Sequence, residues 1–401
     1  MYVRRFAASI AVASVLALLL LGACNRTETA EEPRNEPQES VPGAQLQRPK
    51  ALFLFVVPPP DPKYPEREVF TPAFSKAAED AFAAANWEYR EIRLYEKPTT
   101  EWIPLMRKEI DSYPTVVFSY HDTYSYLFVR LSETVGVRSA NYVLALSSIP
   151  PEASSQIFRL DFRMEELGFI GGVALAHMSR TGHIAVLSFE EEWCDRFVAG
   201  FTQGVREIRA GARVADLRVS RMELVDTRET ADFIWGLVGE AKSRSSSGLG
   251  VDAIAVLASG SADPFISSLM PARIDAISGI TPPHGEWCRA LVLAVLIDFG
   301  RLPLFFVENA DNVGLFKIDV PVRLREGAED SPYMPKTGRG GSLGGVKVIT
   351  AGMREGVLRV AWPPEESVRS RFPDEVESDI AYYERAIEAG EVPIYSEPIR
   401  E

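Results

Sequence analysis

One stretch, residues 165–209, constrains the fold more than any other. It begins with a helical segment rich in small residues, namely Gly168, Gly171, Gly172, Ala174 and Ala176. After a turn at residues 181–182 comes the wholly apolar segment 184–187, and then a second helix with an apolar face of Phe197, Phe201 and Val205. A short, continuous apolar run between two helices is typical of a central strand in a parallel sheet. The stretch therefore predicts a helix, a buried strand and a second helix.

The chain before this stretch alternates strands with helices. The predicted strands are 51–57, 88–94, 115–119 and 142–146, and the predicted helices are 70–87, 99–110 and one from about residue 123. Four strands alternating with three helices predict a doubly wound parallel sheet. We interpret residues 157–162 as the first crossing to a second lobe.

The same alternation continues after the stretch. Strands are predicted at 184–187, within 214–224, at 253–257 and at 276–280, and helices at 192–210 and 227–242. The turn 281–284 suits a second crossing, followed by a very apolar buried helix at 285–299. Further strands are expected at 302–308 and 313–318, a closing hairpin at 346–350 and 357–361, and a terminal helix at 374–389.

The predicted fold class is therefore α/β, with two doubly wound parallel-sheet lobes joined by a multi-strand hinge. The N-terminal lobe is assigned to residues 50–158 with a return at about 285–320. The C-terminal lobe is assigned to residues 159–284 with the segments at about 321–401. Open α/β sheets bind ligands at the carboxyl ends of their strands. This architecture resembles the type I periplasmic binding proteins, which close around a small molecule by hinge motion.

The first 49 residues predict a location in the cell envelope. Arg4 and Arg5 precede the apolar run 6–21, which ends in Leu-Gly-Ala before Cys24. This resembles a bacterial lipoprotein signal peptide; the alternative is a membrane-spanning anchor, which needs about 20 apolar residues. In the lipoprotein interpretation, residues 1–23 are removed and Cys24 is acylated on the extracytoplasmic side of a membrane. Residues 24–49 have little to bury and are expected to form a disordered linker.

Charge and cysteine content exclude several classes of protein. The formal net charge is −13, and loss of Arg4 and Arg5 with the signal peptide makes it −15. An acidic chain argues against nucleic-acid binding. Besides Cys24 there are only Cys194 and Cys288, which form either one disulfide or two buried thiols.

Three segments resemble the basic membrane protein (BMP) family of nucleoside-binding lipoproteins. Residues 166–174 are similar to a helix that opens with a Gly-Tyr-Leu-Ala-Gly-like run, and residues 183–204 to its next strand and its Arg-Phe-x-x-Gly-Phe-x-x-Gly helix. Residues 384–393 resemble the terminal helix of the family. The resemblance implies a lipid-anchored solute-binding protein that delivers a nucleoside-like ligand to the permease of an ABC importer.

Two loops depart from the family pattern. Residues 61–67 lack the Asp-Asp/Lys-Ser-Phe-Asn-like run of the first loop, and residues 279–282 lack the Asp-containing turn. These departures keep a second hypothesis open, in which the lipoprotein keeps the binding fold but serves as a sensor or interaction module for a membrane partner.

Candidate ligand-binding residues were chosen from the segments that follow predicted strands. They are Tyr64, Tyr120, His121, Asp122, Tyr124, Trp193, Ser259, Gly260 and Asp263. Aromatic rings stack on planar bases or sugar faces, and carboxylates accept hydroxyl protons. Packing within a lobe is the alternative role for each aromatic residue. The acidic run 190–192 is either a helix start favoured by the helix dipole or a cleft feature that selects a cation.

Motifs for catalysis are missing from the sequence. There is no His-Glu-x-x-His, no Gly-x-Ser-x-Gly, no clustered metal ligands and no phosphate-binding loop. We therefore expect no enzyme, no cofactor and no metal. The predicted protein is a monomer whose partners are a small-molecule ligand, a permease and, through its acyl chains, a membrane.

Overall fold

The computed structural model describes residues 48–56, 70–94, 102–110, 115–119, 125–133, 140–145, 156–218, 250–257, 266, 269, 274–280, 290–316, 347–364, 369 and 371–397. These ranges belong to one compact unit, residues 47–401. The predicted signal peptide, Cys24, most of the linker and the helix predicted at 227–242 lie outside them. Among the described residues, no helix has the length and apolar character needed to cross a membrane.

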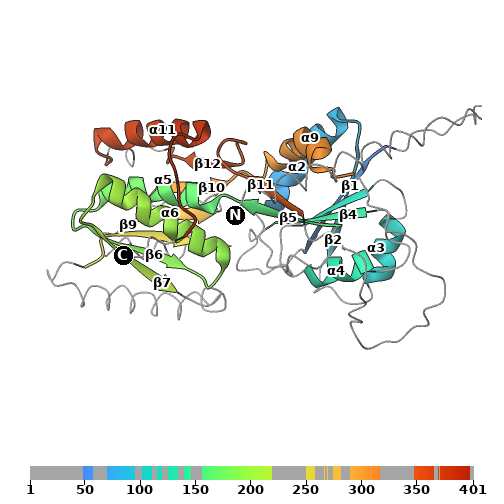
Figure 1. Cartoon of the computed structure of the whole chain (residues 1–401), viewed down its shortest axis with the longest axis horizontal. Helices are drawn as coiled ribbons and strands as arrows, with labels where there is room; N and C mark the ends of the chain where they lie inside the picture. Colours follow the sequence, from blue (N-terminus) through green and yellow to red (C-terminus); the bar gives the residue numbers. More distant parts are fainter. Residues whose placement is uncertain are drawn as a thin grey trace, which may run out of the picture. The chain divides into compact units, whose positions relative to one another are not determined.

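The first sheet has six strands, all parallel, in the order β11-β5-β4-β3-β1-β2 (Figure 1). Its strands are β1 (Lys50–Val56), β2 (Glu88–Leu94), β3 (Thr115–Ser119), β4 (Ala140–Ala145), β5 (Ile157–Phe162) and β11 (Lys347–Ala351). The doubly wound sheet predicted from the sequence is thus confirmed for the first lobe. Segment 157–162, however, is not itself a crossing, because it pairs with β4 as a strand of this sheet.

Both faces of the first sheet are covered, which explains why its strands are apolar throughout. On β1, Ala51 and Phe53 belong to one buried cluster with α2 (Phe70–Ala84) and α9 (Leu302–Val313). Leu52 and Leu54 point to the other face and belong to a separate cluster with side chains of α3 (Trp102–Ile110) and α4 (Ser125–Glu133). This alternation is the period of two that a strand imposes on its side chains.

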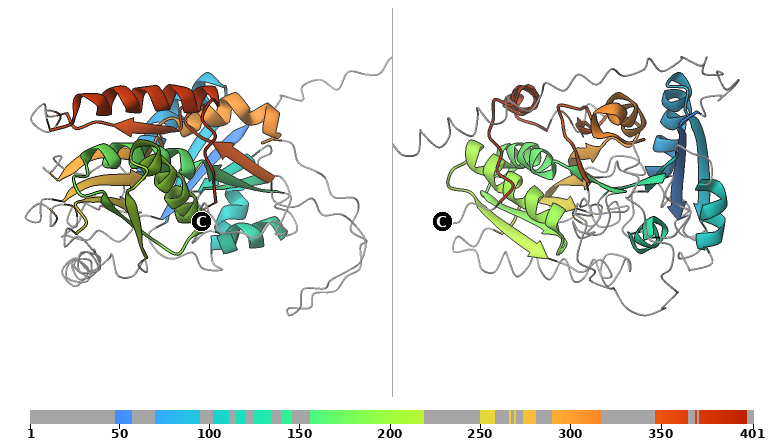
Figure 2. Two further views of the ribbon diagram at one scale, coloured as in Figure 1. Left: turned by 60° about the vertical axis from the view of Figure 1, so that its left-hand side comes forward. Right: turned by 45° about the vertical axis from the view of Figure 1, so that its right-hand side comes forward.

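The second sheet also has six strands, in the order β12-β10-β9-β8-β6-β7. Its strands are β6 (His183–Ser188), β7 (Arg213–Arg218), β8 (Ala253–Leu257), β9 (Asp275–Ile280), β10 (Leu291–Ile297) and β12 (Leu358–Ala361). All pairs are parallel except β10 with β12. Helix α11 (Asp374–Ala389) lies over α5 (Met164–Met178), which packs against β8, β9 and β10 (Figure 2).

Helices α5 and α6 (Glu192–Ile208) contact each other through their backbones. A Cβ atom added to Gly168 would lie 2.1 Å from the carbonyl oxygen of Phe197, and one added to Gly204 would lie 2.1 Å from that of Phe169. Because these glycines have no side chain, the two helices approach more closely than larger residues allow. The small-residue pattern of the stretch 165–209 therefore encodes a specific helix pair.

After residue 284, one predicted helix is a strand and one predicted strand is a helix. The apolar run expected as a helix contains β10, whose residues are all buried. A short apolar run fits a buried strand as well as a buried helix, so periodicity alone did not separate them. The strand expected at 302–308 is part of helix α9, which has Pro303 in its first turn and ends at Gly314 in the left-handed conformation. The strand expected from Val313 is also wrong, because α9 ends there and a turn follows.

The predicted closing hairpin is wrong as well. Strand β11 pairs in parallel with β5 of the first sheet, whereas β12 pairs with β10 of the second. The six residues between them, 352–357, therefore connect the two sheets. Residues 281–284, predicted as a second crossing, lie outside the described residues; β9 and β10 on either side of them are neighbours in the second sheet.

Candidate functional site

The predicted ligand-binding residues follow strands that are neighbours in each sheet. Tyr64 follows β1, and the segment 120–124 follows β3; Ser259, Gly260 and Asp263 follow β8. Strand β1 pairs in parallel with β3, and β6 with β8. These segments therefore begin at the carboxyl ends of neighbouring strands in their respective sheets. Eight of the nine residues lie outside the described part of the chain, and their role stays a prediction. Trp193 is the ninth.

Trp193 lies in the first turn of α6, five residues after Ser188, which ends β6. Its side chain is half-buried, and its ring centroid lies 6.4 Å from that of the buried Phe189, with the two planes tilted by 58°. The indole nitrogen donates a hydrogen bond to the carboxylate of Glu191. The indole ring is thus held in one orientation while part of its surface stays accessible.

Arg218 fixes the loop that carries Trp193, and sequence reasoning did not single it out. Its guanidinium donates a 2.8 Å hydrogen bond to the backbone oxygen of Phe189 and forms ion pairs of 2.8 Å with Asp195 and 2.5 Å with Asp216. Asp216 also accepts a 2.8 Å hydrogen bond from the hydroxyl of Ser188. Asp216 and Arg218 are two residues apart on β7 and therefore lie on the same face of the strand. This spacing of two was the signal in the sequence from which the ion pair could have been predicted.

The acidic run before α6 has different roles along its length. The helix begins at Glu192, so Glu192 and Asp195 occupy its first turn, where the helix dipole favours negative charge. Burial lowers the pKa of Arg218, but hydrogen bonds and charges from Asp216 and Asp195 raise it, and the net shift is upward. Arg218 is therefore a fixed cation that neutralises part of the acidic surroundings.

Cys194 is a free, buried thiol in the next position of the helix. Burial raises its pKa to about 12, so the thiol is protonated and unreactive at neutral pH. Of the two interpretations offered by the sequence, the buried thiol holds for Cys194; Cys288 lies outside the described residues. No group of three or more potential metal ligands occurs in the part of the chain that the structure describes.

Three crossings connect the two sheets within the described ranges. Arg163 alone separates β5 from α5, residues 298–301 separate β10 from α9, and residues 352–357 separate β11 from β12. The first and third crossings are joined by a 2.9 Å hydrogen bond from the amide of Arg163 to the oxygen of Ala351. The amide of Asp298 donates a 2.7 Å hydrogen bond to the oxygen of Val357 and so joins the second to the third.

Arg196 of α6 reinforces the first crossing from the side of the second lobe. Its guanidinium donates a hydrogen bond to the backbone oxygen of Phe162 at the end of β5. The same group forms a 3.0 Å ion pair with Glu165 of α5 and lies 3.9 Å from Asp161 of β5. The crossings are thus held in place by backbone hydrogen bonds and by a charged side chain, that of Arg196, which contacts both lobes.

Comparison with known proteins identifies a related segment in the middle of the chain. The model of the Bmp family, described as ABC transporter substrate-binding protein PnrA-like, matches residues 125–217. This segment runs from α4 to β7 and contains the stretch 165–209. The resemblance to the basic membrane protein family is thereby confirmed. A search among curated proteins gave no match.

Solved structures share the fold over most of the chain. A transcriptional activator of the comK gene from Bacillus halodurans has a TM-score of 0.57 at 13% identity, covering 86% of this chain and 99% of its own. A solute-binding protein of an ABC transporter system from Conexibacter woesei has a TM-score of 0.54 at 11% identity, with coverages of 87% and 99%. One from Aeropyrum pernix has a TM-score of 0.55 at 11% identity, with coverages of 88% and 94%. The predicted fold of type I periplasmic binding proteins is confirmed.

Proposed function

We propose that the chain is a lipid-anchored substrate-binding protein of an ABC importer, which holds a small polar ligand between its two lobes. The ligand is passed to a permease without chemical change. The observation that carries the proposal is the presence of two largely parallel sheets joined, within the described ranges, by three crossings. This is the arrangement in which lobes close around a solute by hinge motion.

The resemblance to nucleoside-binding lipoproteins suggests the class of ligand. A nucleoside has a planar base, which stacks on an indole ring, and hydroxyl groups, which donate to carboxylates. Trp193 supplies an oriented indole beside the end of β6. Tyr120, Asp122 and Asp263 are the residues proposed to complete the site from the neighbouring strand ends.

Thermal unfolding tests the proposal across chemical classes. The soluble part, residues 25–401, is heated with nucleosides, bases, sugars and amino acids in turn. A ligand at about 100 times its Kd adds roughly 2.7 kcal/mol of stability, which raises the midpoint by several degrees. A shift with nucleosides alone supports the proposed ligand. A shift with another class keeps the transport role but changes the ligand. If the midpoint of initially ligand-free protein is unchanged with every compound, the proposal is contradicted.

Substitution of Trp193 tests its part in the site. We expect Trp193→Ala to weaken binding of the ligand found in that panel about tenfold, because loss of one stacking contact of about 1.4 kcal/mol changes Kd by that factor. Trp193→Phe should restore much of the affinity. Tyr382→Ala removes an aromatic side chain that is 56% exposed on α11 and serves as the control. Equal affinities for all three variants would remove Trp193 from the site.

The membrane anchor is a separate part of the proposal. Cys24 follows a run of the length and flanking residues that lipoprotein signal peptidase recognises. Radiolabelled palmitate should be incorporated into the full chain and not into Cys24→Ser. Equal labelling of both proteins would contradict acylation at this residue.

A second candidate function is a sensor or interaction module for a membrane partner. Two observations favour it: the first loop, residues 61–67, lacks the family motif, and one protein of the same fold is described as a transcriptional activator. A protein of this kind binds a membrane partner whether or not a solute is transported. Importer genes beside this one favour transport, whereas a histidine-kinase or chemoreceptor gene favours sensing.

A further inference from the structure

A buried carboxylate lies where the first and third crossings meet. Glu166 is in the first turn of α5, and the residue is 5% exposed. Its Oε2 accepts a 2.8 Å hydrogen bond from the backbone amide of Met353, and its Oε1 lies 3.2 Å from Nη1 of Arg163. Arg163 is the first crossing, and Met353 begins the turn of the third. One side chain therefore contacts both connections.

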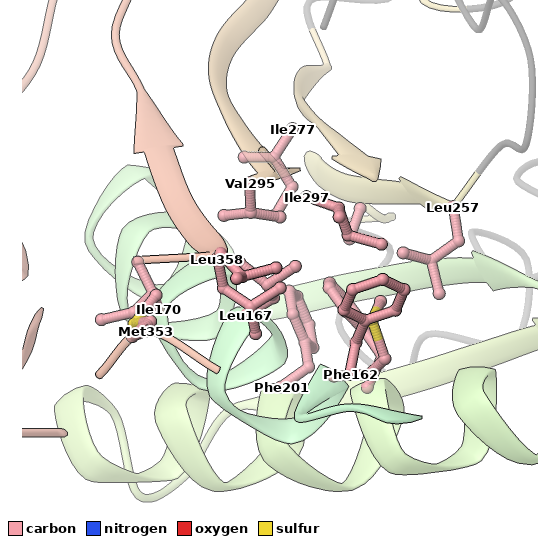
Figure 3. Packing of buried hydrophobic residues seen from close by; sticks show 14 of the residues in the cluster. Phe162, Leu167, Ile170, Phe201, Leu257, Ile277, Val295, Ile297, Met353 and Leu358 are labelled. Atoms are coloured by element: carbon pink, nitrogen blue, oxygen red, sulfur yellow. The ribbon is translucent and has the colours of Figure 1, made fainter. Parts of the chain in front are cut away.

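The third crossing is shaped to receive this carboxylate. A Cβ atom on Gly352 would lie 2.6 Å from Oε2 of Glu166 and 2.9 Å from Cδ of Arg163, so a side chain at position 352 would displace both. The side chain of Met353 is buried in the same cluster as Leu167 and Ile170 of α5, together with Leu358 after the crossing (Figure 3). The turn is thus anchored to α5 by a hydrogen bond and by apolar packing.

Burial of Glu166 carries an energetic cost. Burial raises its pKa above the ordinary value, although the Met353 amide and Arg163 oppose the shift. The neighbouring Glu165 carboxylate raises it further. An apolar side chain would avoid this cost of desolvation, but it could not accept the hydrogen bond of the Met353 amide. The carboxylate of Glu166 therefore offsets its cost of desolvation by linking the two crossings.

We propose that Glu166 is a positioning residue of the hinge. It couples the first and third crossings, so that these two connections move together when one lobe rotates relative to the other. This inference rests on the proposed function, because a hinge is needed only if the lobes close on a ligand. Without Glu166, the amide of Met353 loses its acceptor, and the third crossing is held to the first only by the backbone hydrogen bond from Arg163 to Ala351 and by apolar packing. The orientation of the lobes then becomes less defined, while each lobe keeps its fold.

The distance between the lobes gives a direct test that needs no ligand. Spin labels are attached through unnatural ketone side chains at Glu79 of α2 and Glu377 of α11, both exposed, in the full chain. Pulsed electron resonance then gives the distance distribution. We expect Glu166→Ala to at least double its width, with unchanged secondary structure by circular dichroism. The control is Glu355→Ala, which removes only the 2.7 Å bond to the Gly352 amide within the third crossing and should leave the width unchanged.

The close contact with Gly352 provides a second, independent test. Gly352→Ala should displace the Glu166 side chain and broaden the distribution as Glu166→Ala does. In the double variant the carboxylate is already missing and only the flexible Arg163 side chain has to move, so the methyl group should add little further broadening. Additive effects, or unchanged widths in both single variants, would overturn the inference. Because neither measurement uses a ligand, such a failure is distinguishable from failure of the proposed binding function.

Discussion

Each lobe has a six-stranded, largely parallel sheet, but the two lobes build their cores in different ways. In the first lobe, bulky side chains fill the space between sheet and helices; the rings of Phe53 and Phe74, for example, stack with centroids 4.2 Å apart. In the second lobe, α5 and α6 meet through glycines, and a Cβ atom on Gly172 would lie 2.2 Å from the oxygen of Phe201. The first core can adjust by moving side chains, whereas the second is limited by rigid backbone.

This difference bears on function because α5 also forms one end of the hinge. Helix α5 begins directly after the first crossing and carries Glu165 and Glu166, which contact Arg196 and the third crossing. A helix fixed by backbone contacts gives these charged groups a stable support. We therefore expect the second lobe to tolerate less change in its core than the first.

The largest effect is expected from alanine at the backbone contacts. Gly172→Ala should lower the free energy of unfolding by about 3 kcal/mol or more, because the helices must separate to relieve the contact. Gly171→Ala meets only the terminal methyl of Ile277 at 2.6 Å, which can change rotamer, and should cost less. Gly211→Ala, with no atom within 4 Å, is the control. Urea unfolding measures the series, and equal losses at all three positions would refute the proposed difference between cores.

A smaller loss is expected in the first lobe. Phe74→Leu removes the ring that stacks on Phe53 but keeps an apolar side chain, so the free energy of unfolding should fall by about 1 kcal/mol. The loss should be confined to the first lobe, as followed by hydrogen exchange in β1 and β3. A loss as large as that of Gly172→Ala would mean that the first core is equally intolerant.

The first lobe also contains a position where a substitution should stabilise it. Within the described ranges, the buried hydroxyl of Tyr142 on β4, beside Phe128, has no hydrogen-bond partner, and burial raises its pKa. Removing an unsatisfied buried hydroxyl should raise the free energy of unfolding by about 1 kcal/mol. Tyr142→Phe is compared by urea unfolding with Tyr383→Phe, whose hydroxyl lies 3.4 Å from Glu207 at the surface. If Tyr142→Phe destabilises the protein, the hydroxyl has a partner in solution.

The smallest effect is a dependence on pH in the second lobe. Burial raises the pKa of Glu166 in the folded protein above its ordinary value. Its contribution to stability is therefore fully present below the unfolded pKa and is lost as pH rises through the folded pKa. Relative to Glu166→Gln, the wild type should lose stability over this window, by at most about 1.4 kcal/mol per pH unit. Asp275 and Glu384, whose pKa values are also raised, are present in both proteins and cancel. A constant difference would show that Glu166 does not titrate in the window.

Sequence reasoning predicted the fold well where the local pattern and the pairing agreed. The alternating elements before residue 165 and the stretch 165–209 carry clear periods, and the terminal helix 374–389 agrees with α11. The prediction failed after residue 284. The apolar run that forms β10 is compatible with a buried helix or a buried strand, and Pro303 in the first turn was the main signal that α9 is a helix. The hairpin error arose because β11 and β12 are neighbours in sequence but belong to different sheets.

For the candidate site, the sequence indicated which loops to consider but not the contacts between them. Trp193 was identified because it follows a predicted strand. Arg218 was missed, since its importance comes from contacts with Phe189 and Asp195, which are distant in sequence. Glu166 was noted only as part of a family-like helix, because its partner Met353 lies in a segment predicted to close a hairpin. Contacts of this kind depend on how the crossings are arranged.

The central claim is that the chain binds one small molecule without altering it, and titration calorimetry tests this most directly. Protein freed of any co-purified compound by unfolding and refolding is titrated with adenosine, guanosine, inosine and uridine, then with bases, sugars and amino acids. We expect saturable binding of a nucleoside at one molecule per chain, with the compound recovered unchanged. Absence of saturable binding for every class, by refolded protein with native secondary structure, would contradict the account.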